Sequence, residues 1–256
     1  MRRLLLALGL LLSTLAPAAA QKVAASPLTF FYLDPKPERL VGFLDGYAQS
    51  PQDWAAYPPM VGFFAVVFRK FPDWTERLAP RAFDGKTAVT VAYAYKLSSL
   101  PPMPAALHDR LFATQPDGRL QAEFPALPMR VEDLQIKTPT DLDVMWGAFG
   151  GSGDERYVRK ILGFLAATID ASHEMGIDVT KLTMAFLTHT QQEISQELRP
   201  KYDDTQLRRL VYASTAQWAL MSNAQQHPRV RQIIDAYSAE HPGSETTQSL
   251  AALLKK

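Results

Sequence analysis

The sequence predicts an all-α protein of helical hairpins, stacked into an irregular solenoid-like array or a bundle, with a short extended N-terminal arm. Two observations carry this prediction. Apolar residues recur at helical spacing in long stretches, as at Val158, Ile161 and Leu165. Pro, Gly or acidic residues stand where one such stretch ends and the next begins, as helix ends require.

Residues 1–20 have the composition of a secretory signal peptide. Two arginines precede an apolar stretch from Leu4 to Leu15, and small residues follow up to Ala20, where we expect cleavage. The leucine-rich centre favours the general secretory route over a twin-arginine signal. The stretch is shorter than the roughly 20 apolar residues that span a bilayer, so we expect a periplasmic or secreted chain without stable membrane insertion.

Composition excludes several classes of function. Without its leader the 256-residue chain keeps 236 residues, enough for one large domain or two small ones. The absence of cysteine excludes a thiol nucleophile, a zinc–thiolate site and redox chemistry. The leader holds two of the 27 basic residues and none of the 26 acidic ones, so the mature chain is nearly neutral. Its basic residues occur in pairs, as on solvated helix faces, and we expect no nucleic-acid partner.

The first half of the mature chain is expected to hold an arm and then helices. Residues 21–36 contain an apolar, aromatic run that ends at Asp-Pro, which predicts an entry strand or extended arm. Residues 37–100 form the N-terminal helical part, with helices at 37–46, 60–68 and 87–97. Alternating valines and tyrosines leave a strand as the alternative for the last of these, where we favour a helix.

Residues 101–138 are expected to connect two halves across the surface. Six prolines fall in this range and interrupt regular structure. A short helix at 105–112 is expected within the connection.

Residues 139–256 form the C-terminal helical-hairpin part. Thr140 or Asp141 is expected to cap the first helix and Asp154 the second. The helices are expected from this cap to Phe149, from Asp154 through Ile169, at 178–198, 203–223 and 228–237, and from Pro242 or Ser244 to Leu254. In the longest, the residues expected to face inward are Leu207, Leu210, Val211, Trp218 and Met221.

Three segments share the layout of a hairpin, with inner helices aligned at Gly62, Trp146 and Trp218 and outer helices starting ten residues later. One hairpin cannot bury both of its faces, so stacking of neighbours is expected. Chance similarity between all-α hairpins is the alternative, and the uneven spacing departs from a strict array.

The hairpin turns also carry a resemblance. Its residues are Trp146, Asp154 and Tyr157-Val158-Arg159 in one hairpin, and Trp218, Asn223 and His227-Pro228-Arg229-Val230 in the next. Here the chain resembles exported bacterial proteins of unknown function with tetratricopeptide-like or solenoid-like hairpins, and a fainter likeness extends over residues 62–78. The resemblance implies helical architecture and supplies no catalytic residue.

His189 and Glu193 are the candidate residues for chemistry. They lie four residues apart and would share one face of a helix, as a metal-binding or catalytic pair requires. Two ligands are too few for a zinc site, so we expect no metal and no cofactor. The simpler interpretation makes His189 a boundary residue beside Phe186.

Three other patterns have simpler structural interpretations. The Gly-rich run 150–154 lacks the spacing of a phosphate-binding loop or a nucleophile elbow, and is expected to end one helix and start another. The carboxylate pairs Asp141/Asp143 and Asp203/Asp204 stand where helices begin, so capping is expected. The tryptophans at 54, 74, 146 and 218 are expected to pack in cores.

The sequence therefore favours an exported, non-catalytic helical protein that interacts with a protein partner or acts as a scaffold. The alternative is a carrier of a small molecule or lipid, with an apolar cavity lined by Phe63, Phe64, Tyr93 and Tyr95. The second alternative is a hydrolase whose site, with His189 and Glu193, assembles only in three dimensions.

Overall fold

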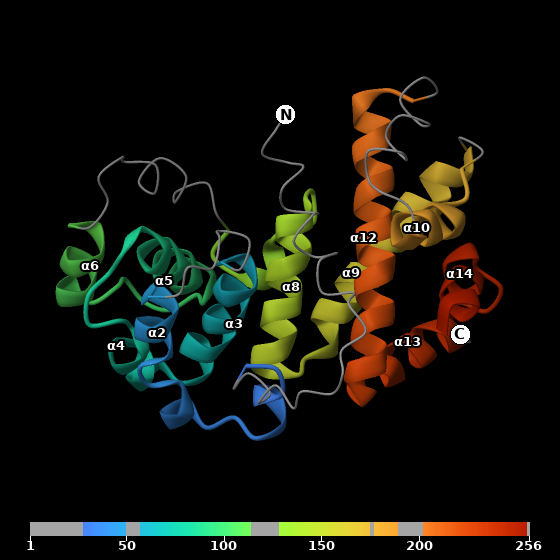
Figure 1. Cartoon of the computed structure of the whole chain (residues 1–256). Helices are drawn as coiled ribbons and strands as arrows, with labels where there is room; N and C mark the ends of the chain where they lie inside the picture. The colour runs from blue at the N-terminus through green and yellow to red at the C-terminus, as the bar shows by residue number, and fades with distance from the viewer. Residues whose placement is uncertain (1–27, 50–56, 114–127, 175–176, 189–201, 255–256) are drawn as a thin grey trace. The chain divides into compact units, whose positions relative to one another are not determined.

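A computed structural model describes residues 28–49, 57–113, 128–174, 177–188 and 202–254 (Figure 1). Within these ranges the chain forms eleven α-helices and four 3-10 turns, and its β pairing is limited to one isolated bridge between Ser98 and Arg130. The all-α prediction is confirmed. By its internal contacts the chain divides into two compact units, residues 1–135 with 143–154, and residues 136–142 with 155–256. The solenoid-like stacking stays a prediction.

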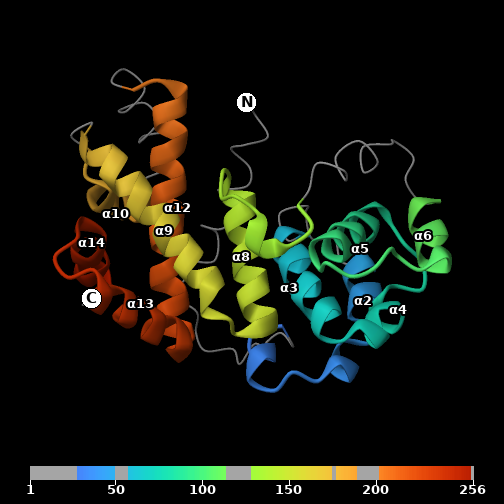
Figure 2. The same ribbon diagram turned by 180° about the vertical axis from the view of Figure 1, so that it is seen from behind.

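The first unit is centred on two helices, α3 and α5, which lie side by side (Figures 1 and 2). Every residue of α3 from Val61 to Phe68 is buried. The elements of this unit are η1 (Phe31–Leu33), η2 (Pro37–Leu40), α2 (Phe43–Gln49), α3 (Tyr57–Lys70), η4 (Pro72–Trp74), α4 (Thr75–Leu78), α5 (Gly85–Leu97), α6 (Ala105–Phe112), η6 (Val131–Asp133) and the larger part of α8 (Pro139–Ser152).

The segment expected as a strand or helix at 87–97 is helical. A capping box fixes the start of α5, since the Thr87 amide donates to the Asp84 carboxylate at 2.7 Å and the Asp84 amide donates to the Thr87 hydroxyl at 3.0 Å. The alternation of valines and tyrosines is compatible with this helix, because α5 is buried on most sides. Such a helix has no polar face, so its sequence shows no helical spacing of apolar and polar residues.

The N-terminal arm differs from its prediction. Of residues 21–36, those from Leu28 onward are described, and they form 3-10 turns rather than a strand. The predicted helix 37–46 is also divided, because Val41 is extended and Gly42 has a φ of +76°, a conformation that favours glycine. A 3-10 turn therefore precedes this break, and α2 follows it.

The helix expected at 105–112 within the proline-rich connection is confirmed as α6. Further on, η6 is tied to the end of α3 by a two-bond ion pair, in which Arg69 donates to Glu132 at 2.7 and 3.0 Å. The segment before it is held by the bridge between Ser98 and Arg130.

Glycines allow α3 and α8 to approach closely. A Cβ atom on Gly62 would lie 1.9 Å from the carbonyl oxygen of Val144, and one on Gly147 would lie 1.8 Å from that of Pro59. Such distances are far below van der Waals contact, so the two helix backbones meet only because these positions lack side chains.

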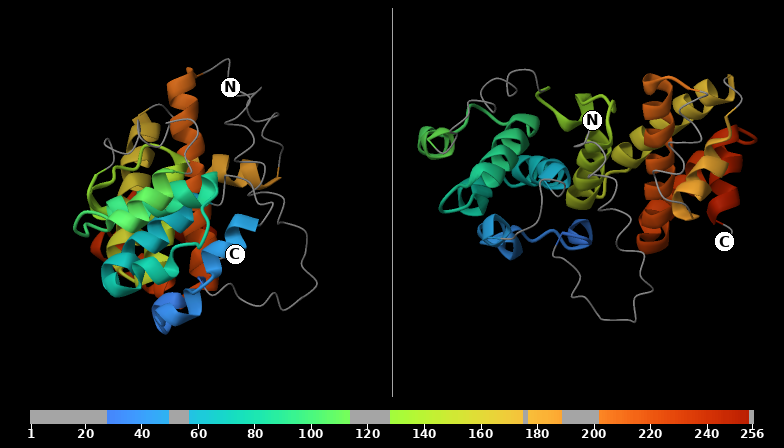
Figure 3. Two further views of the ribbon diagram at one scale, coloured as in Figure 1. Left: turned by 90° about the vertical axis from the view of Figure 1, so that its left-hand side faces the viewer. Right: turned by 45° about the horizontal axis from the view of Figure 1, so that its top comes forward.

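The second unit contains α9 (Glu155–Glu174), α10 (Val179–Thr188), α12 (Asp204–Gln226), α13 (Pro228–Glu240) and α14 (Glu245–Leu254), together with the first turn of α8. The long helix α12 packs against α9, α10, α13 and α14 (Figures 2 and 3). The predicted apolar stripe of α9 is confirmed, since Val158, Ile161 and Leu165 are all fully buried.

The inward face of α12 is partly different from the prediction. Leu210 is fully buried, but the predicted inward residues Leu207, Val211, Trp218 and Met221 are only half-buried. The buried positions between Leu210 and Leu220 are instead Ala213, Ser214, Ala216 and Gln217. Small residues let α12 lie close to several helices at once, and the large apolar residues therefore occupy the margins of the contact.

Candidate functional site

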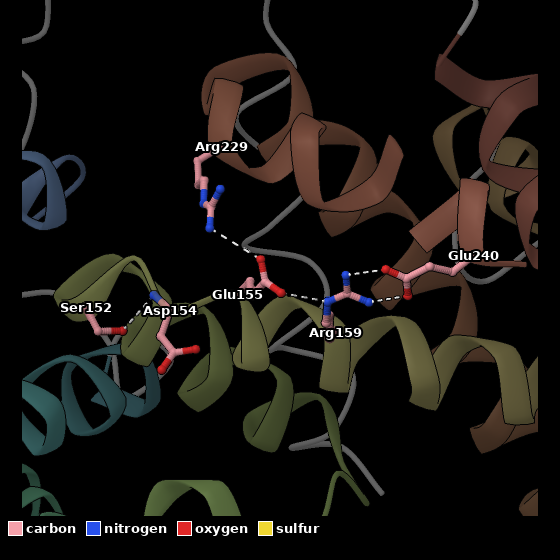
Figure 4. Close-up of polar contacts among 6 residues, drawn as sticks. All are labelled: Ser152, Asp154, Glu155, Arg159, Arg229 and Glu240. Carbon is pink, nitrogen blue, oxygen red and sulfur yellow. Dashed lines mark hydrogen bonds and ion pairs between the residues drawn. The ribbon is translucent and has the colours of Figure 1, made fainter. Parts of the chain in front are cut away.

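The Gly-rich run at the end of α8 forms a helix terminus. Gly150, Gly151 and Ser152 belong to the last turn of α8, and Gly153 takes a φ of +69°. The Ser152 hydroxyl donates to the Ala148 carbonyl at 2.7 Å and accepts from the Asp154 amide at 3.2 Å (Figure 4). Because its proton is engaged within the helix, Ser152 fits the helix-ending role that the sequence favoured over a nucleophile elbow.

Packing explains why glycines occur here. A Cβ on Gly153 would lie 2.8 Å from the Tyr32 ring, and one on Gly151 would lie 2.5 Å from the Val66 side chain. Close packing and the left-handed backbone of Gly153 therefore explain the glycines at these positions, and a phosphate-binding role is not needed to explain them.

An ion-pair network follows this turn in the second unit. Arg159 on α9 binds Glu240 on α13 through two hydrogen bonds of 2.7 and 2.8 Å, and its Nε donates to Glu155 at 3.1 Å. The other oxygen of Glu155 accepts from Arg229 at 3.3 Å (Figure 4). The network thus joins the start of α9 to both ends of α13.

The charges of this network compensate one another. The hydrogen bonds from Arg159 lower the pKa of Glu240, and the same pairing raises the pKa of Arg159. The two arginines and two glutamates of the network balance in charge, and all four side chains are 30 to 51% exposed. The arrangement therefore fits a role in helix packing.

The first carboxylate pair divides into two different environments. Asp141 accepts hydrogen bonds from the amides of Lys137 and Thr138 and from the Thr138 hydroxyl, at 2.8 to 2.9 Å. Thr138, rather than Thr140 or Asp141, therefore precedes α8 as its cap, with Asp141 as the reciprocal partner. Burial raises the pKa of Asp143, two residues further on, to about 7.

The second carboxylate pair caps a helix as expected. The Asp203 carboxylate accepts from the amides of Thr205 and Gln206 at 2.8 and 2.9 Å, in a capping box that starts α12. Ser244 has the corresponding role for α14 and accepts from the Thr247 amide at 3.2 Å.

The candidate pair His189 and Glu193 lies outside the described residues. Of the histidines that the structure describes, His173 pairs with Glu245 at 2.9 Å and His108 with Asp109 at 3.3 Å. His227 is buried between α12 and α13, and this burial lowers its pKa. Within the described ranges, no three His, Asp or Glu side chains gather so that they could hold a metal ion.

The aromatic residues named for a carrier cavity lie in the core of the first unit. Phe63 and Phe64 are in edge-to-face contact, with ring centroids 5.3 Å apart, and Tyr93 is buried on α5. The Tyr95 hydroxyl donates to the Pro101 carbonyl at 3.0 Å. Their contacts are those of packed core side chains.

The tryptophans of the described chain are half-buried. Trp74 is covered by the Arg77 guanidinium, 4.2 Å from the ring centroid. Trp146 packs against Phe149 with centroids 6.3 Å apart, and its buried Nε1 has no hydrogen-bond partner in the described part of the chain. Trp54 lies outside the described residues.

Two features escaped prediction from the sequence. Phe30 and Leu33 are exposed, by 37% and 68%, in a segment expected to be an entry strand or extended arm. Gln217 is fully buried in the second unit, where it binds hydroxyl groups of two other helices. The position of Gln217 among apolar residues of α12 was the sequence feature from which its burial could have been predicted.

Comparison with protein-family models, curated proteins and solved structures found no match to this chain. None of the helices in the described ranges is both long and apolar enough to cross a membrane.

Proposed function

We propose that the protein is an exported, non-catalytic interaction module, and that Phe30 and Leu33 belong to the surface that contacts its protein partner. The single observation behind this proposal is the concentration of exposed apolar side chains near the N-terminal end of the described chain. Four large apolar residues are classed as exposed in the described ranges, and three of them, Phe30, Leu33 and Val41, fall within twelve positions.

The segment that carries Phe30 and Leu33 is firmly anchored. Phe31 is 2% exposed and packs against Phe63 with ring centroids 5.2 Å apart, while Tyr32 packs against Phe149 at 5.1 Å. Phe30 precedes the 3-10 turn η1, and the Leu33 amide closes the turn on the Phe30 carbonyl at 3.0 Å, so we place these two exposed side chains on one apolar edge. A fixed edge loses little conformational freedom on binding, which favours recognition.

The hydrogen bonds and ion pairs of several ionisable groups support a non-catalytic role. The Asp141 carboxylate is the reciprocal partner of the Thr138 cap, that of Asp203 caps α12, and those of Glu155 and Glu240 are paired with arginines. The Ser152 hydroxyl is engaged in its own helix. Groups held in this way stabilise the fold and are poorly placed to transfer protons to a substrate.

The signal-peptide features of residues 1–20 support export. We expect the mature chain to begin at Gln21, and Edman sequencing or intact mass measurement of the exported form tests this. A partner would then be a periplasmic, envelope or secreted protein.

The interaction is tested by crosslinking and affinity capture from the exported fraction of the source cells. The baits are the mature protein, the double variant Phe30→Ser/Leu33→Asp, and Met129→Gln as a control that removes another exposed apolar side chain, 51% exposed. We expect a protein that the wild type and the control retain and the double variant loses. The purified partner should bind the double variant at least about tenfold more weakly.

Recovery of the same proteins by all three baits would contradict the assignment of this surface. Co-purification of a small molecule, detected by native mass spectrometry with no protein retained, would favour the carrier instead. Equal melting temperatures of the three baits ensure that the comparison concerns binding and not folding.

A further inference from the structure

The second unit has a buried amide at the meeting point of three helices. Gln217 on α12 is 0% exposed, and its amide group contacts Thr183 and Thr180 on α10 and Ser249 on α14. An amide removed from water is stable only if its oxygen and its N–H groups find partners. The partners of Gln217 therefore determine how two other helices must lie on α12.

The hydrogen bonds reach α10 and α14 from the same side chain. The Thr183 hydroxyl lies 2.5 Å from the Gln217 amide oxygen, and the Thr180 hydroxyl lies 3.4 Å from the amide nitrogen. The amide nitrogen also donates to the Ser249 hydroxyl, which in turn contacts the Thr180 hydroxyl. Both orientations of the amide have the same three hydroxyl partners.

We propose that Gln217 makes α10 and α14 one cooperative segment of the second unit, so that the two helices open and close together. Displacement of α14 removes Ser249 from both Gln217 and Thr180, which leaves the polar groups that hold α10 incompletely bonded. Displacement of α10 removes Thr183 and Thr180 from the buried amide of Gln217, which then holds Ser249 and α14 with its oxygen unpaired. Because an unpaired polar group is costly in an apolar interior, loosening of one helix loosens the other.

The apolar contacts of the two helices do not require this coupling. The buried residues of α10 include Val179 and Leu182, and α10 packs on α12. Those of α14 include Leu250 and Leu253, and α14 packs on α9 and α12. Each helix thus has apolar contacts of its own on α12, so we assign their cooperation to the polar cluster of Gln217, Thr180 and Ser249.

Hydrogen exchange of the native mature protein, resolved by mass spectrometry, tests the proposal. The variants are Ser249→Ala on α14 and Thr183→Val on α10, both conservative in size. We expect each to accelerate exchange by about tenfold in both helices, and to leave α13 unchanged. Lys181→Ala on α10 and Gln248→Ala on α14 are matched controls, because neither side chain contacts Gln217, and they should not affect the other helix.

The proposal is wrong if each substitution accelerates exchange only in the helix that carries it. A double-mutant cycle provides a second measurement. The effects of Thr183→Val and Ser249→Ala on unfolding should be non-additive in the wild type and additive in a Gln217→Leu background. Additivity in the wild type would equally overturn the coupling.

Discussion

Substitution of Gly62 by alanine tests the close approach of α3 and α8. The added Cβ would lie 1.9 Å from the Val144 carbonyl oxygen and 2.9 Å from the Ala148 amide nitrogen. Ordinary contact begins at 3.4 Å, so the two backbones would have to separate by about 1.5 Å at this point. Backbone atoms cannot rotate away as a flexible side chain can, and the strain must spread along both helices.

The expected cost follows from two opposing effects. Overpacking of a tight contact costs about 1–3 kcal/mol, and separation of the helices also weakens neighbouring dispersion contacts. The better helix propensity of alanine returns about 1 kcal/mol. We therefore expect Gly62→Ala to lower the free energy of unfolding by about 1–2 kcal/mol, which corresponds to a fall in melting temperature of about 2–8 °C.

Two other glycines provide controls with the opposite sign. Gly46 on α2, in the same unit, and Gly163 on α9 would each place a Cβ where nothing lies within 4 Å. Alanine at either position should raise stability by about 0.5–1 kcal/mol. Urea unfolding followed by circular dichroism measures all three variants. A stabilising effect of Gly62→Ala, equal to that of the controls, would refute the close contact between the helices.

Three further predictions concern polar groups. Burial raises the pKa of Asp143 from 3.8 to about 7. The protein is therefore expected to be most stable, as far as this group is concerned, below pH 4, and to lose at most about 1.4 kcal/mol of unfolding free energy per pH unit as the pH rises toward 7. Asp143→Asn should remove this loss, which urea unfolding between pH 4 and pH 7 measures. The pKa of Glu240 is lowered by Arg159, so their pairing stabilises the fold above the ordinary pKa of Glu240 and fades as the pH falls through the lowered value. Glu240→Gln should therefore lower the melting temperature at neutral pH but have little effect in strong acid, and an equal effect at both would exclude the ion pair as the cause. The Ser214 hydroxyl is buried and has no hydrogen-bond partner among the described residues, so Ser214→Ala should leave the free energy of unfolding unchanged or raise it, whereas a clear loss would indicate a missed partner.

Helix positions in this chain were predictable where caps and apolar stripes coincide. Pro228 begins α13, and the stripe of α9 is buried as expected. The range 105–112 matches α6. These features depend on neighbouring residues only, which is why sequence reasoning reaches them.

Predictions failed where tertiary contacts decide. The run at Leu28 to Leu33 has the composition of a strand, yet the described part of the chain contains no strand that could pair with it, and a 3-10 turn instead buries Phe31 against Phe63. The exposed edge of Phe30 and Leu33 is a consequence of that turn, so a strand interpretation could not reveal it. The division of the predicted helix 37–46 follows from the backbone of a single glycine, Gly42.

The buried polar residues of the second unit indicate what a sequence can reveal about such contacts. The hydroxyls of Thr168 and Ser172 donate to carbonyls four residues earlier in α9, so burial of these residues requires no partner outside their own helix. Gln217 differs, because its longer amide side chain has bonds to α10 and α14. A buried glutamine on a long helix therefore predicts a partner on another helix, whereas a buried serine or threonine can be satisfied by a carbonyl of its own helix. This difference explains why substitution of Gln217 should destabilise α10 and α14, whereas removal of the Ser214 hydroxyl one turn away should not.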